Sequence, residues 1–202
     1  MTDDLERRLA AGTPGAAFDL DRLRAAITHR AAEEGLIDVA YGAYDSPIGA
    51  LTVMVSDRGL VRVSYPGDGI AAQLEELADR VSPRILEAAA LTDQVRRQLD
   101  EYFDGTRRSF DVRIDWRLVR GFAREVLAVT SAIPFGSVST YGEVAARAGS
   151  PRAYRAAGNA LGSNPIPIVV PCHRVLHAGG GLGGYSGGLD RKRYLLNLEE
   201  AS

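Results

Sequence analysis

The sequence contains one cysteine, Cys172, in 202 residues. A single cysteine excludes an intramolecular disulfide and the cysteine clusters of a structural zinc site, and it is typical of a reducing compartment. Runs of about 18 apolar residues are missing, and the N-terminus is polar and acidic, so we expect neither a membrane span nor a secretion signal. These absences predict a cytoplasmic protein.

Aromatic residues are also scarce, at 7%, and the formal net charge is only −2. The total alone argues against a nucleic-acid-binding protein. The charge is unevenly distributed, however: residues 140–202 carry seven Lys or Arg and four acidic residues, a net +3, which leaves −5 for residues 1–139. We therefore expect any polyanionic partner to contact the C-terminal part.

The length suits one domain or two small ones. Residues 1–38 predict one amphipathic helix in an N-terminal extension packed on the surface, to which no chemistry is assigned. Residues 39–65 alternate with period two and predict a hairpin or small sheet. Helices are expected at 71–80 and 92–103, and a further strand at 110–114.

Helical spacing of apolar residues predicts a helix over 122–133. Thr140 and Glu143 lie three apart, the spacing of a capping box, so a second helix should begin at Tyr141 and end at Gly149. Two short helices joined by a tight turn with glycine indicate a helix-turn-helix.

The expected second helix of this pair is Pro151–Leu161, with Ser150 as its N-cap and Pro151 at its first position. Its inward face is predicted to hold Tyr154, Gly158 and Leu161, and its outward face Arg152, Arg155, Ala156 and Asn159. Apart from the arginines, the outward side chains are small enough to let the helix press into a DNA groove. An ordinary surface helix is the alternative.

The segment Asn164–Val175 delivers the cysteine. Prolines at 165, 167 and 171 stiffen it, and Ile168–Val170 has the composition of a short buried strand. Cys172 follows, with His173 directly beside it. This pattern predicts a positioned nucleophile, against the alternative that Cys172 is only a small buried hydrophobic residue.

Residues 178–188 contain seven glycines in eleven positions. A phosphate-binding loop is rejected because the strand and the Lys-Ser/Thr of that motif are missing. A glycine-rich loop can instead bring backbone N–H groups against a planar ligand, the alternative being a flexible surface loop. A basic stretch at 190–193 and an apolar helical tail at 194–198 end in Glu199.

Three stretches carry a family resemblance. Pro171–Val175 reads Pro-Cys-His-Arg-Val, preceded by Asn164-Pro165 and followed by Gly-Gly-Tyr-Ser-Gly-Gly-Leu at 183–189. A weaker match lies at Tyr44–Leu51. Together they resemble the O6-alkylguanine-DNA alkyltransferase family, the methylated-DNA–protein-cysteine methyltransferases.

The resemblance implies an α+β fold. It would consist of a small N-terminal antiparallel-sheet, ribonuclease-H-like domain at 39–118 and a C-terminal helical, winged-helix-like domain with a helix-turn-helix at 119–202. Residues 1–38 lie outside the resemblance. Neither a metal nor an organic cofactor is implied.

The resemblance also implies a mechanism. Members bind double-stranded DNA in the minor groove, flip the damaged nucleotide and move the alkyl group of O6-alkylguanine, and of O4-alkylthymine, to Cys172 in a single turnover. The thiol pKa must be lowered from about 8.5 for a thiolate to form. His173 would take the proton through a water, since neighbours on an extended chain point to opposite sides. Glu199 would orient His173, and Asn164 would brace the turn before the cysteine.

By the same resemblance, Arg155 fills the gap in the base stack and Tyr141 crowds the phosphate. The full set of expected DNA contacts is Tyr141, Ser150, Arg155, Ala156 and Gly158, and the expected alkylguanine pocket is Val175, Tyr185 and Ser186. The protein is expected to be a nucleoid-associated monomer that can bind cooperatively on DNA. His29 and His177 are expected to face solvent.

Three other functions are weighed against this one. A lesion-binding protein of the same architecture usually has Trp in place of the cysteine, whereas this chain keeps Cys172. A cysteine hydrolase is disfavoured because adjacent Cys172 and His173 make direct proton transfer awkward. A plain transcription factor has no use for a buried thiol.

Overall fold

The computed structural model describes residues 20–200. By its internal contacts the chain forms two compact units, Met1–Leu36 and Ile37–Ser202, which are considered separately. The first unit contributes helix α2, Leu20–Glu33. Its surface carries i,i+4 pairs between His29 and Glu33 and between Arg30 and Glu34. The helix predicted within residues 1–38 is thus present over its described part, and residues 1–19 lie outside the described residues.

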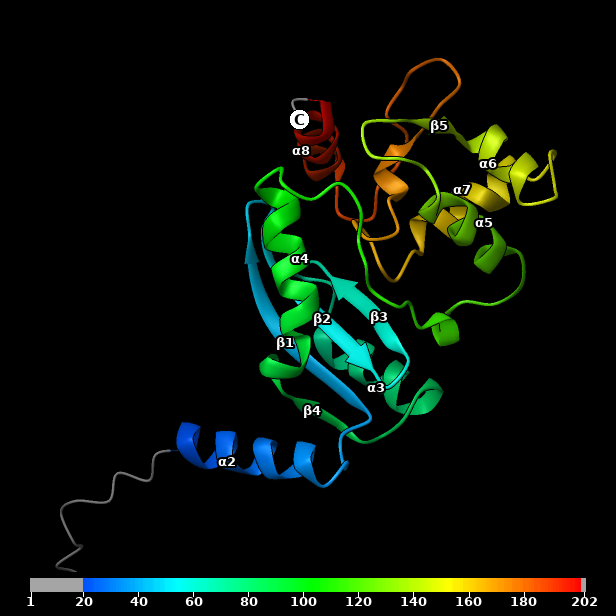
Figure 1. Cartoon of the computed structure of the whole chain (residues 1–202). Helices are drawn as coiled ribbons and strands as arrows, with labels where there is room; N and C mark the ends of the chain where they lie inside the picture. Colours follow the sequence, from blue (N-terminus) through cyan, green and yellow to red (C-terminus); the bar gives the residue numbers. More distant parts are fainter. Residues whose placement is uncertain (1–19, 201–202) are drawn as a thin grey trace, which may run out of the picture. The chain divides into compact units, whose positions relative to one another are not determined.

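The second unit begins with a four-stranded sheet of order β3-β2-β1-β4 (Figure 1). Strands β1 (Val39–Ser46), β2 (Gly49–Ser56) and β3 (Gly59–Ser64) are antiparallel neighbours, as the period-two pattern predicts. The short β4 (Ile85–Glu87) pairs in parallel with β1 and was not predicted.

Apolar side chains cover both faces of this sheet. Helix α3 (Ile70–Arg80) buries Leu77 with Val39 and Met54 in the smaller of two hydrophobic clusters. The short helix η1 (Ala89–Thr92) leads into α4 (Asp93–Phe103), which packs its apolar residues in the main cluster. Both predicted helices are confirmed, and the main cluster continues from α4 into the helical part that follows.

The strand predicted at 110–114 is wrong. Only Ile114 forms a bridge, in parallel with Leu60. The side chain of Gln98 donates to the carbonyl of Asp111 (3.1 Å) and accepts from its N–H (2.8 Å). A side chain thus satisfies the backbone groups that a neighbouring strand would otherwise pair, so the segment stays extended but outside the sheet.

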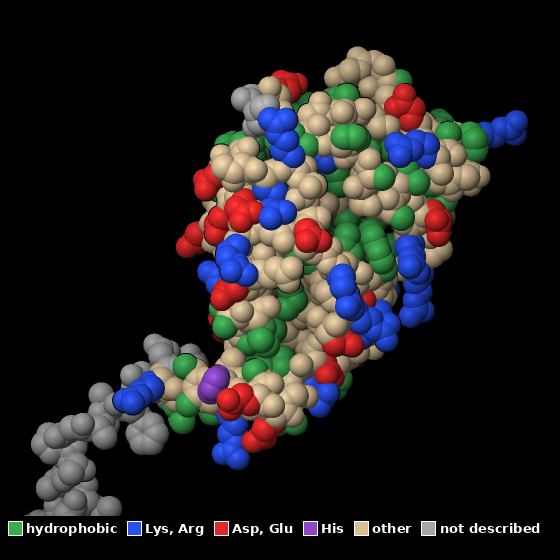
Figure 2. Space-filling view, in the orientation of Figure 1, with side chains coloured by type: hydrophobic (Ala, Val, Ile, Leu, Met, Phe, Trp, Pro, Cys, Tyr) green, Lys and Arg blue, Asp and Glu red, His purple; other side chains and the backbone are tan. Residues whose placement is uncertain are grey.

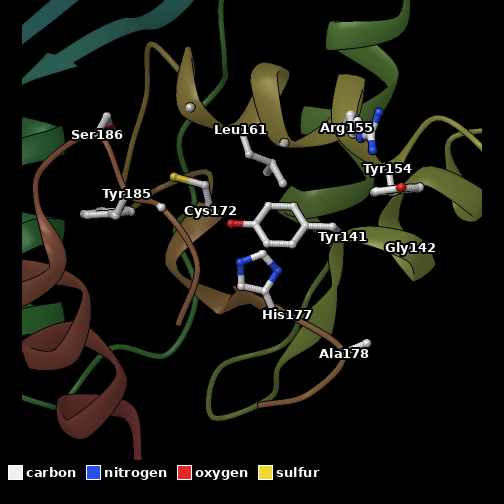
Figure 3. A pocket seen from close by; sticks show the side chains of 13 residues that line it. Tyr141, Gly142, Tyr154, Arg155, Leu161, Cys172, His177, Ala178, Tyr185 and Ser186 are labelled. Atoms are coloured by element: carbon white, nitrogen blue, oxygen red, sulfur yellow. The ribbon is translucent and has the colours of Figure 1, made fainter. Parts of the chain in front are cut away.

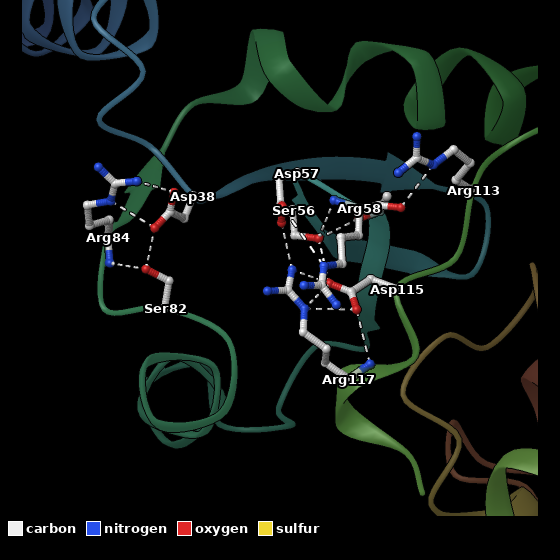
Figure 4. Close-up of polar contacts among 10 residues, drawn as sticks. Asp38, Ser56, Asp57, Arg58, Ser82, Arg84, Arg113, Asp115 and Arg117 are labelled. Carbon is white, nitrogen blue, oxygen red and sulfur yellow. Dashed lines mark hydrogen bonds and ion pairs between the residues drawn. The ribbon is translucent and has the colours of Figure 1, made fainter.

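A polar cluster fixes the start of the next segment to the sheet (Figure 4). Asp115 is buried, accepts from the hydroxyl of Ser56 (2.6 Å) and forms an ion pair with Arg117 (2.5 Å). Burial raises the pKa of Asp115, but these hydrogen bonds outweigh it and the net pKa is lowered. The carboxylate therefore stays charged and holds η2 (Trp116–Leu118) beside β2 and β3.

The helical part then runs through α5 (Gly121–Ser131), β5 (Ser139–Thr140), α6 (Tyr141–Arg147), α7 (Tyr154–Gly162), η3 (Cys172–Arg174), β6 (Val175–Leu176) and α8 (Leu189–Glu200). Strand β5 pairs in parallel with β6. The capping box at the start of α6 is confirmed: Glu143 N–H donates to Thr140 Oγ1 (3.2 Å), and Thr140 N–H donates to Glu143 Oε2 (2.8 Å). The expected α+β fold is confirmed. In the described part of the chain, no helix is long and apolar enough to cross a membrane.

The predicted start of the second helix is wrong. Residues 150–153 form a turn in which Ala153 N–H donates to Ser150 O (2.9 Å), and α7 begins at Tyr154 without a side-chain cap. Its buried residues are Ala157, Ala160 and Leu161, whereas Tyr154 is 49% exposed. The helix is therefore shorter than expected, and it presents Tyr154 together with Arg155 instead of burying it.

The strand predicted at Ile168–Val170 is also wrong, although its side chains are buried. The segment folds into turns, with Val170 N–H donating to Ile166 O (2.9 Å) and Ile168 at a φ of 74°. Proline nitrogens carry no hydrogen, so the three prolines cannot supply the donors of a strand ladder. Cys172 thus follows a compact series of turns.

Candidate functional site

A pocket of about 750 Å³ lies between α6, α7, η3 and the glycine-rich loop (Figure 3). The predicted residues that line it are Tyr141, Arg155, Gly158, Cys172, Tyr185 and Ser186. The same wall also includes Tyr154 and His177, which the sequence analysis did not place there. His177 is exposed, as expected, but its ring lies 5.2 Å from that of Tyr141. The pocket therefore gathers residues from two helices and one loop around a single thiol.

Three of the residues predicted to contact DNA or the alkylguanine are not among those that line this pocket. Ser150 belongs to the surface turn before α7, and Ala156 lies on the exposed face of that helix. Val175 is fully buried and is not among the residues that line the pocket. Its carbonyl accepts a 2.7 Å hydrogen bond from Lys192 Nζ instead. The expectation that Val175 borders the alkylguanine with its backbone groups stays a prediction.

Asn164 holds the cysteine in place. Its side-chain nitrogen donates both to Val170 O (2.8 Å) and to Cys172 Sγ (3.2 Å), while its oxygen accepts from Ile166 N–H (3.0 Å). Val170 and Ile166 belong to the turns between α7 and η3, and Cys172 is the first residue of η3. One buried side chain thus joins the end of α7 to the sulfur atom.

Cys172 is 4% exposed. Burial raises the pKa of its thiol to about 11, although the hydrogen bond from Asn164 and the charge of Lys192 act in the opposite direction. The expectation of a lowered thiol pKa is wrong, because burial outweighs both. The resting side chain is a neutral thiol and needs a proton acceptor before it can react.

His173 is the neighbouring candidate for that acceptor. It is fully buried, and its Nε2 lies 2.8 Å from Glu199 Oε1. An ionised carboxylate only accepts hydrogen bonds, so we infer that Nε2 carries the ring proton and that Nδ1 holds a lone pair. Nδ1 is buried and has no hydrogen-bond partner among residues 20–200. Burial lowers the pKa of His173, although Glu199 acts in the opposite direction. The lowered pKa keeps the ring neutral.

Cys172 and His173 lie in a turn of 3₁₀ helix, η3, and not on an extended chain. The reason given for their opposite orientation is therefore wrong. The unpartnered Nδ1 is nevertheless where a bridging water would bind.

Glu199 is held by more donors than the sequence analysis expected. Arg174 donates from Nε to Oε2 and from Nη2 to Oε1, each at 2.8 Å, and the backbone N–H of Gly136 donates at 3.3 Å. Burial raises the pKa of Glu199, but the hydrogen bonds from His173 and Arg174 outweigh it and lower the pKa to about 2. Arg174, which the sequence analysis did not single out, thus keeps the carboxylate ionised.

The glycine-rich loop is attached to the rest of the site by Lys192. This side chain is fully buried in α8, and its ammonium donates to the carbonyls of Val175, Leu182 and Gly184. Tyr185 in the loop shares a 2.5 Å hydrogen bond with the hydroxyl of Tyr65 at the end of β3. A loop with few side chains is therefore held in one position over the thiol.

Charges of both signs are mixed on the surface of the protein. In the face that Figure 2 shows, Lys and Arg side chains lie near acidic ones on both the sheet part and the helical part. On α7 the guanidinium of Arg155 lies 5.7 Å from the ring centre of Tyr154, at the rim of the pocket. A positive charge that lines the pocket is thus carried by the second helix of the expected helix-turn-helix.

Comparison with known families agrees with this architecture. Residues 39–116 match the description "6-O-methylguanine DNA methyltransferase, ribonuclease-like domain". Residues 121–201 match "6-O-methylguanine DNA methyltransferase, DNA binding domain". Fold and site together define a DNA-binding protein with a buried cysteine nucleophile.

Individual relatives point the same way. The methylated-DNA–protein-cysteine methyltransferase of Mycolicibacterium paratuberculosis is 41% identical over 161 residues, which cover 80% of this chain and 92% of the relative. The protein of that name from Methanosarcina acetivorans is 38% identical, with coverages of 79% and 97%. The chain belongs to the methylated-DNA–protein-cysteine methyltransferase family.

Solved structures are similar as well. The O6-methylguanine methyltransferase of Mycobacterium tuberculosis gives a TM-score of 0.69 at 37% identity, covering 81% of this chain and 93% of the other. The structure described as OGT from the same organism in complex with DNA gives 0.65 at 37% identity, with coverages of 80% and 93%. The expected family is confirmed.

Proposed function

We propose that this chain repairs DNA by transferring the alkyl group of O6-alkylguanine, flipped out of the duplex, to Sγ of Cys172. O4-alkylthymine is proposed as a second substrate. The observation that carries the proposal is the position of the thiol. Cys172 forms part of the wall of a pocket of about 750 Å³ that α7 also lines, and the next residue, His173, pairs with Glu199.

The chemistry follows from the protonation states. A neutral thiol gives its proton, through a water, to the Nδ1 lone pair of His173, and Glu199 stabilises the resulting imidazolium. The thiolate attacks the alkyl carbon, a C–S bond forms, and the C–O6 bond breaks with its electron pair left on the base. The guanine anion that leaves then takes up one proton, and the imidazolium of His173 releases the proton that it received from the thiol, so the charge balances. The products are unmodified guanine and a thioether on Cys172.

The DNA-binding part supplies the geometry for flipping. Helix α7 presents Arg155 at the pocket rim and the small residues Ala156 and Gly158 along its length, which suits close approach to the minor groove. Arg155 is proposed to fill the gap in the base stack, and Tyr141 to crowd the phosphate. Tyr185 is proposed to pack on the flipped base and Ser186 to border it.

The transfer is proposed to occur once per molecule, because a thioether is stable and its removal needs a second nucleophile or a reductant. We further propose that the protein binds DNA as a monomer. The division into 1–38, 39–118 and 119–202 is retained as part of this proposal, with the flipping and transfer machinery in the last segment.

Intact mass spectrometry tests the function directly. After incubation with a duplex containing O6-methylguanine, the protein is expected to gain about 14 Da, one methyl replacing one hydrogen, on Cys172. With excess duplex the yield is expected to stop at one methyl per molecule. Tight lesion binding without a mass gain would instead favour a lesion-binding protein, and repeated turnover would overturn the single-transfer mechanism.

A glycine at the pocket edge gives a second prediction. Gly183 has a φ of 69°, and an added Cβ would overlap the hydroxyl of Tyr141 and approach its Cε2 to 3.0 Å. Gly183→Ala is therefore expected to displace Tyr141 and to slow single-turnover transfer by about 10²-fold, the usual cost of a misplaced group. Gly179→Ala is the matched control, since no atom of the described part of the chain lies within 4 Å of its added Cβ. Equal rates for both variants would contradict a fixed position of Tyr141.

A further inference from the structure

A tyrosine from the sheet part of the protein reaches the catalytic carboxylate. Tyr102 lies on α4, is fully buried, and donates its hydroxyl hydrogen to Glu199 Oε1 at 2.7 Å. The same oxygen accepts from His173 Nε2 at 2.8 Å. The two contacts join residues 97 and 26 positions apart along the chain. Tyr102 and His173 thus share Glu199 Oε1 as their hydrogen-bond acceptor.

The direction of the Tyr102 hydrogen bond is settled by the chemistry of its partners. Burial, and secondarily the negative charge of Glu199, raises the pKa of Tyr102, so its hydroxyl remains protonated and donates. Oε1 also accepts from Arg174 Nη2 at 2.8 Å. Three donors therefore share the negative charge of one oxygen, and each weakens the stabilisation that the other two receive.

We propose that Tyr102 is a positioning residue for alkyl transfer, which fixes Oε1 against His173 and limits how strongly Glu199 favours the protonated imidazole. This inference rests on the proposed function and deepens it. Through this hydrogen bond, helix α4 of the N-terminal part helps to position Glu199 in the C-terminal part. A ring kept neutral at physiological pH is free to accept the thiol proton when the lesion enters.

The other groups that face His173 come from two elements and one loop. Arg174 lies on η3, Glu199 and Lys192 on α8, and Tyr185 on the glycine-rich loop places its ring edge-on at 6.5 Å. Replacing any of these side chains would leave its own hydrogen-bond partners unpaired. The Tyr102 hydroxyl differs, because the substitution Tyr102→Phe removes it alone. The ring still packs on Phe103, Phe110 and Phe135. Glu199 keeps its other hydrogen-bond donors.

The test is the pH dependence of single-turnover transfer by the full chain, measured with an O6-methylguanine duplex. The acid limb of the wild-type profile reports protonation of His173. In Tyr102→Phe the midpoint of that limb is expected to move upward by about half a unit to one unit, because one competing donor is gone. At alkaline pH the rate is expected to stay within about threefold of wild type.

Tyr44→Phe is the matched control. It removes another buried hydroxyl from the same hydrophobic cluster, one that hydrogen-bonds Asp100 instead of Glu199. Its acid limb is expected to coincide with that of wild type. A uniform loss of rate in Tyr102→Phe at every pH, or an unmoved midpoint, would overturn the positioning role.

A second variant preserves the fold more closely still. 3-Fluorotyrosine at position 102 makes the hydroxyl a stronger donor, so the midpoint is expected to move downward. The ¹⁵N titration of the His173 ring, followed by NMR in the same variants, should shift in the same directions. If the wild-type protein transfers no alkyl group, the proposed function fails, and the NMR titration still decides whether Tyr102 tunes His173.

Discussion

Replacing Glu199 with glutamine is expected to lower the free energy of unfolding by about 3–5 kcal/mol, the typical result of leaving one partner of a buried ion pair uncompensated. Arg174 is only 6% exposed, and the Glu199 carboxylate accepts from both its Nε and its Nη2. Glutamine keeps the shape of the side chain but removes the charge and puts an N–H₂ group against other donors. Urea denaturation at neutral pH measures the loss.

The same substitution is expected to slow alkyl transfer by about 10³–10⁴-fold, because a neutral amide no longer enforces the His173 tautomer or stabilises its protonated form. Glu200→Gln is the matched control, since its side chain is exposed on the same helix. A Glu199→Gln protein with wild-type rate and stability would contradict the role given to the carboxylate.

Acid titration gives an independent readout of Glu199. Its folded pKa of about 2 lies below the ordinary value of 4.5, so its contribution to stability is present above about pH 4.5 and is lost as the pH falls toward 2. The Glu199→Gln protein should lack this part of the acid dependence. An identical slope of stability against pH in both proteins would show that Glu199 is not the group responsible.

Replacing Cys172 with alanine is expected to abolish transfer, a loss of at least about 10⁴-fold, while lesion affinity stays within about threefold. The pocket walls remain, and the Asn164 amide that loses Sγ as an acceptor keeps its bond to Val170 O at 2.8 Å. The stability cost should therefore be modest, about 1–2 kcal/mol for one small buried side chain.

The measurement for Cys172→Ala is the amount of O6-methylguanine left in the duplex after prolonged incubation, with binding followed separately by fluorescence anisotropy. Gly179→Ala, changed on the exposed loop, serves as the active control. Residual transfer by Cys172→Ala would identify a second acceptor. Lost binding together with lost transfer would mean that the thiol supports the pocket rather than reacting in it.

Much of the fold was predictable because its signals are local. Alternation over 39–65 is enough for a hairpin, and Thr140 with Glu143 satisfies its own capping geometry wherever the helix lies. The three-residue β4 has no such signal, since its pairing with β1 depends on a partner more than forty residues away. Ile168–Val170 was misjudged because β-branched composition predicts burial more reliably than it predicts a strand.

The site was predictable as far as neighbours in sequence define it. Cys172 and His173 stand side by side, and the resemblance supplied Glu199. Lys192 was interpreted only as part of a basic stretch. Lysine is rarely buried, and no periodicity in the sequence reveals the carbonyls among which this one lies. A lowered thiol pKa was expected because the reaction needs a thiolate, but the burial that raises this pKa is known only once the chain has folded.

The hydrogen bonds of Lys192 have a consequence for how strongly a base can bind in the pocket. One ammonium ties the strand after the cysteine, through Val175, to the glycine-rich loop, through Leu182 and Gly184. The loop around Leu182 and Gly184 therefore loses its conformational freedom when the protein folds and not when the lesion arrives, which lowers the entropy that binding must offset. An arriving nucleotide meets a wall that is already in place at these residues.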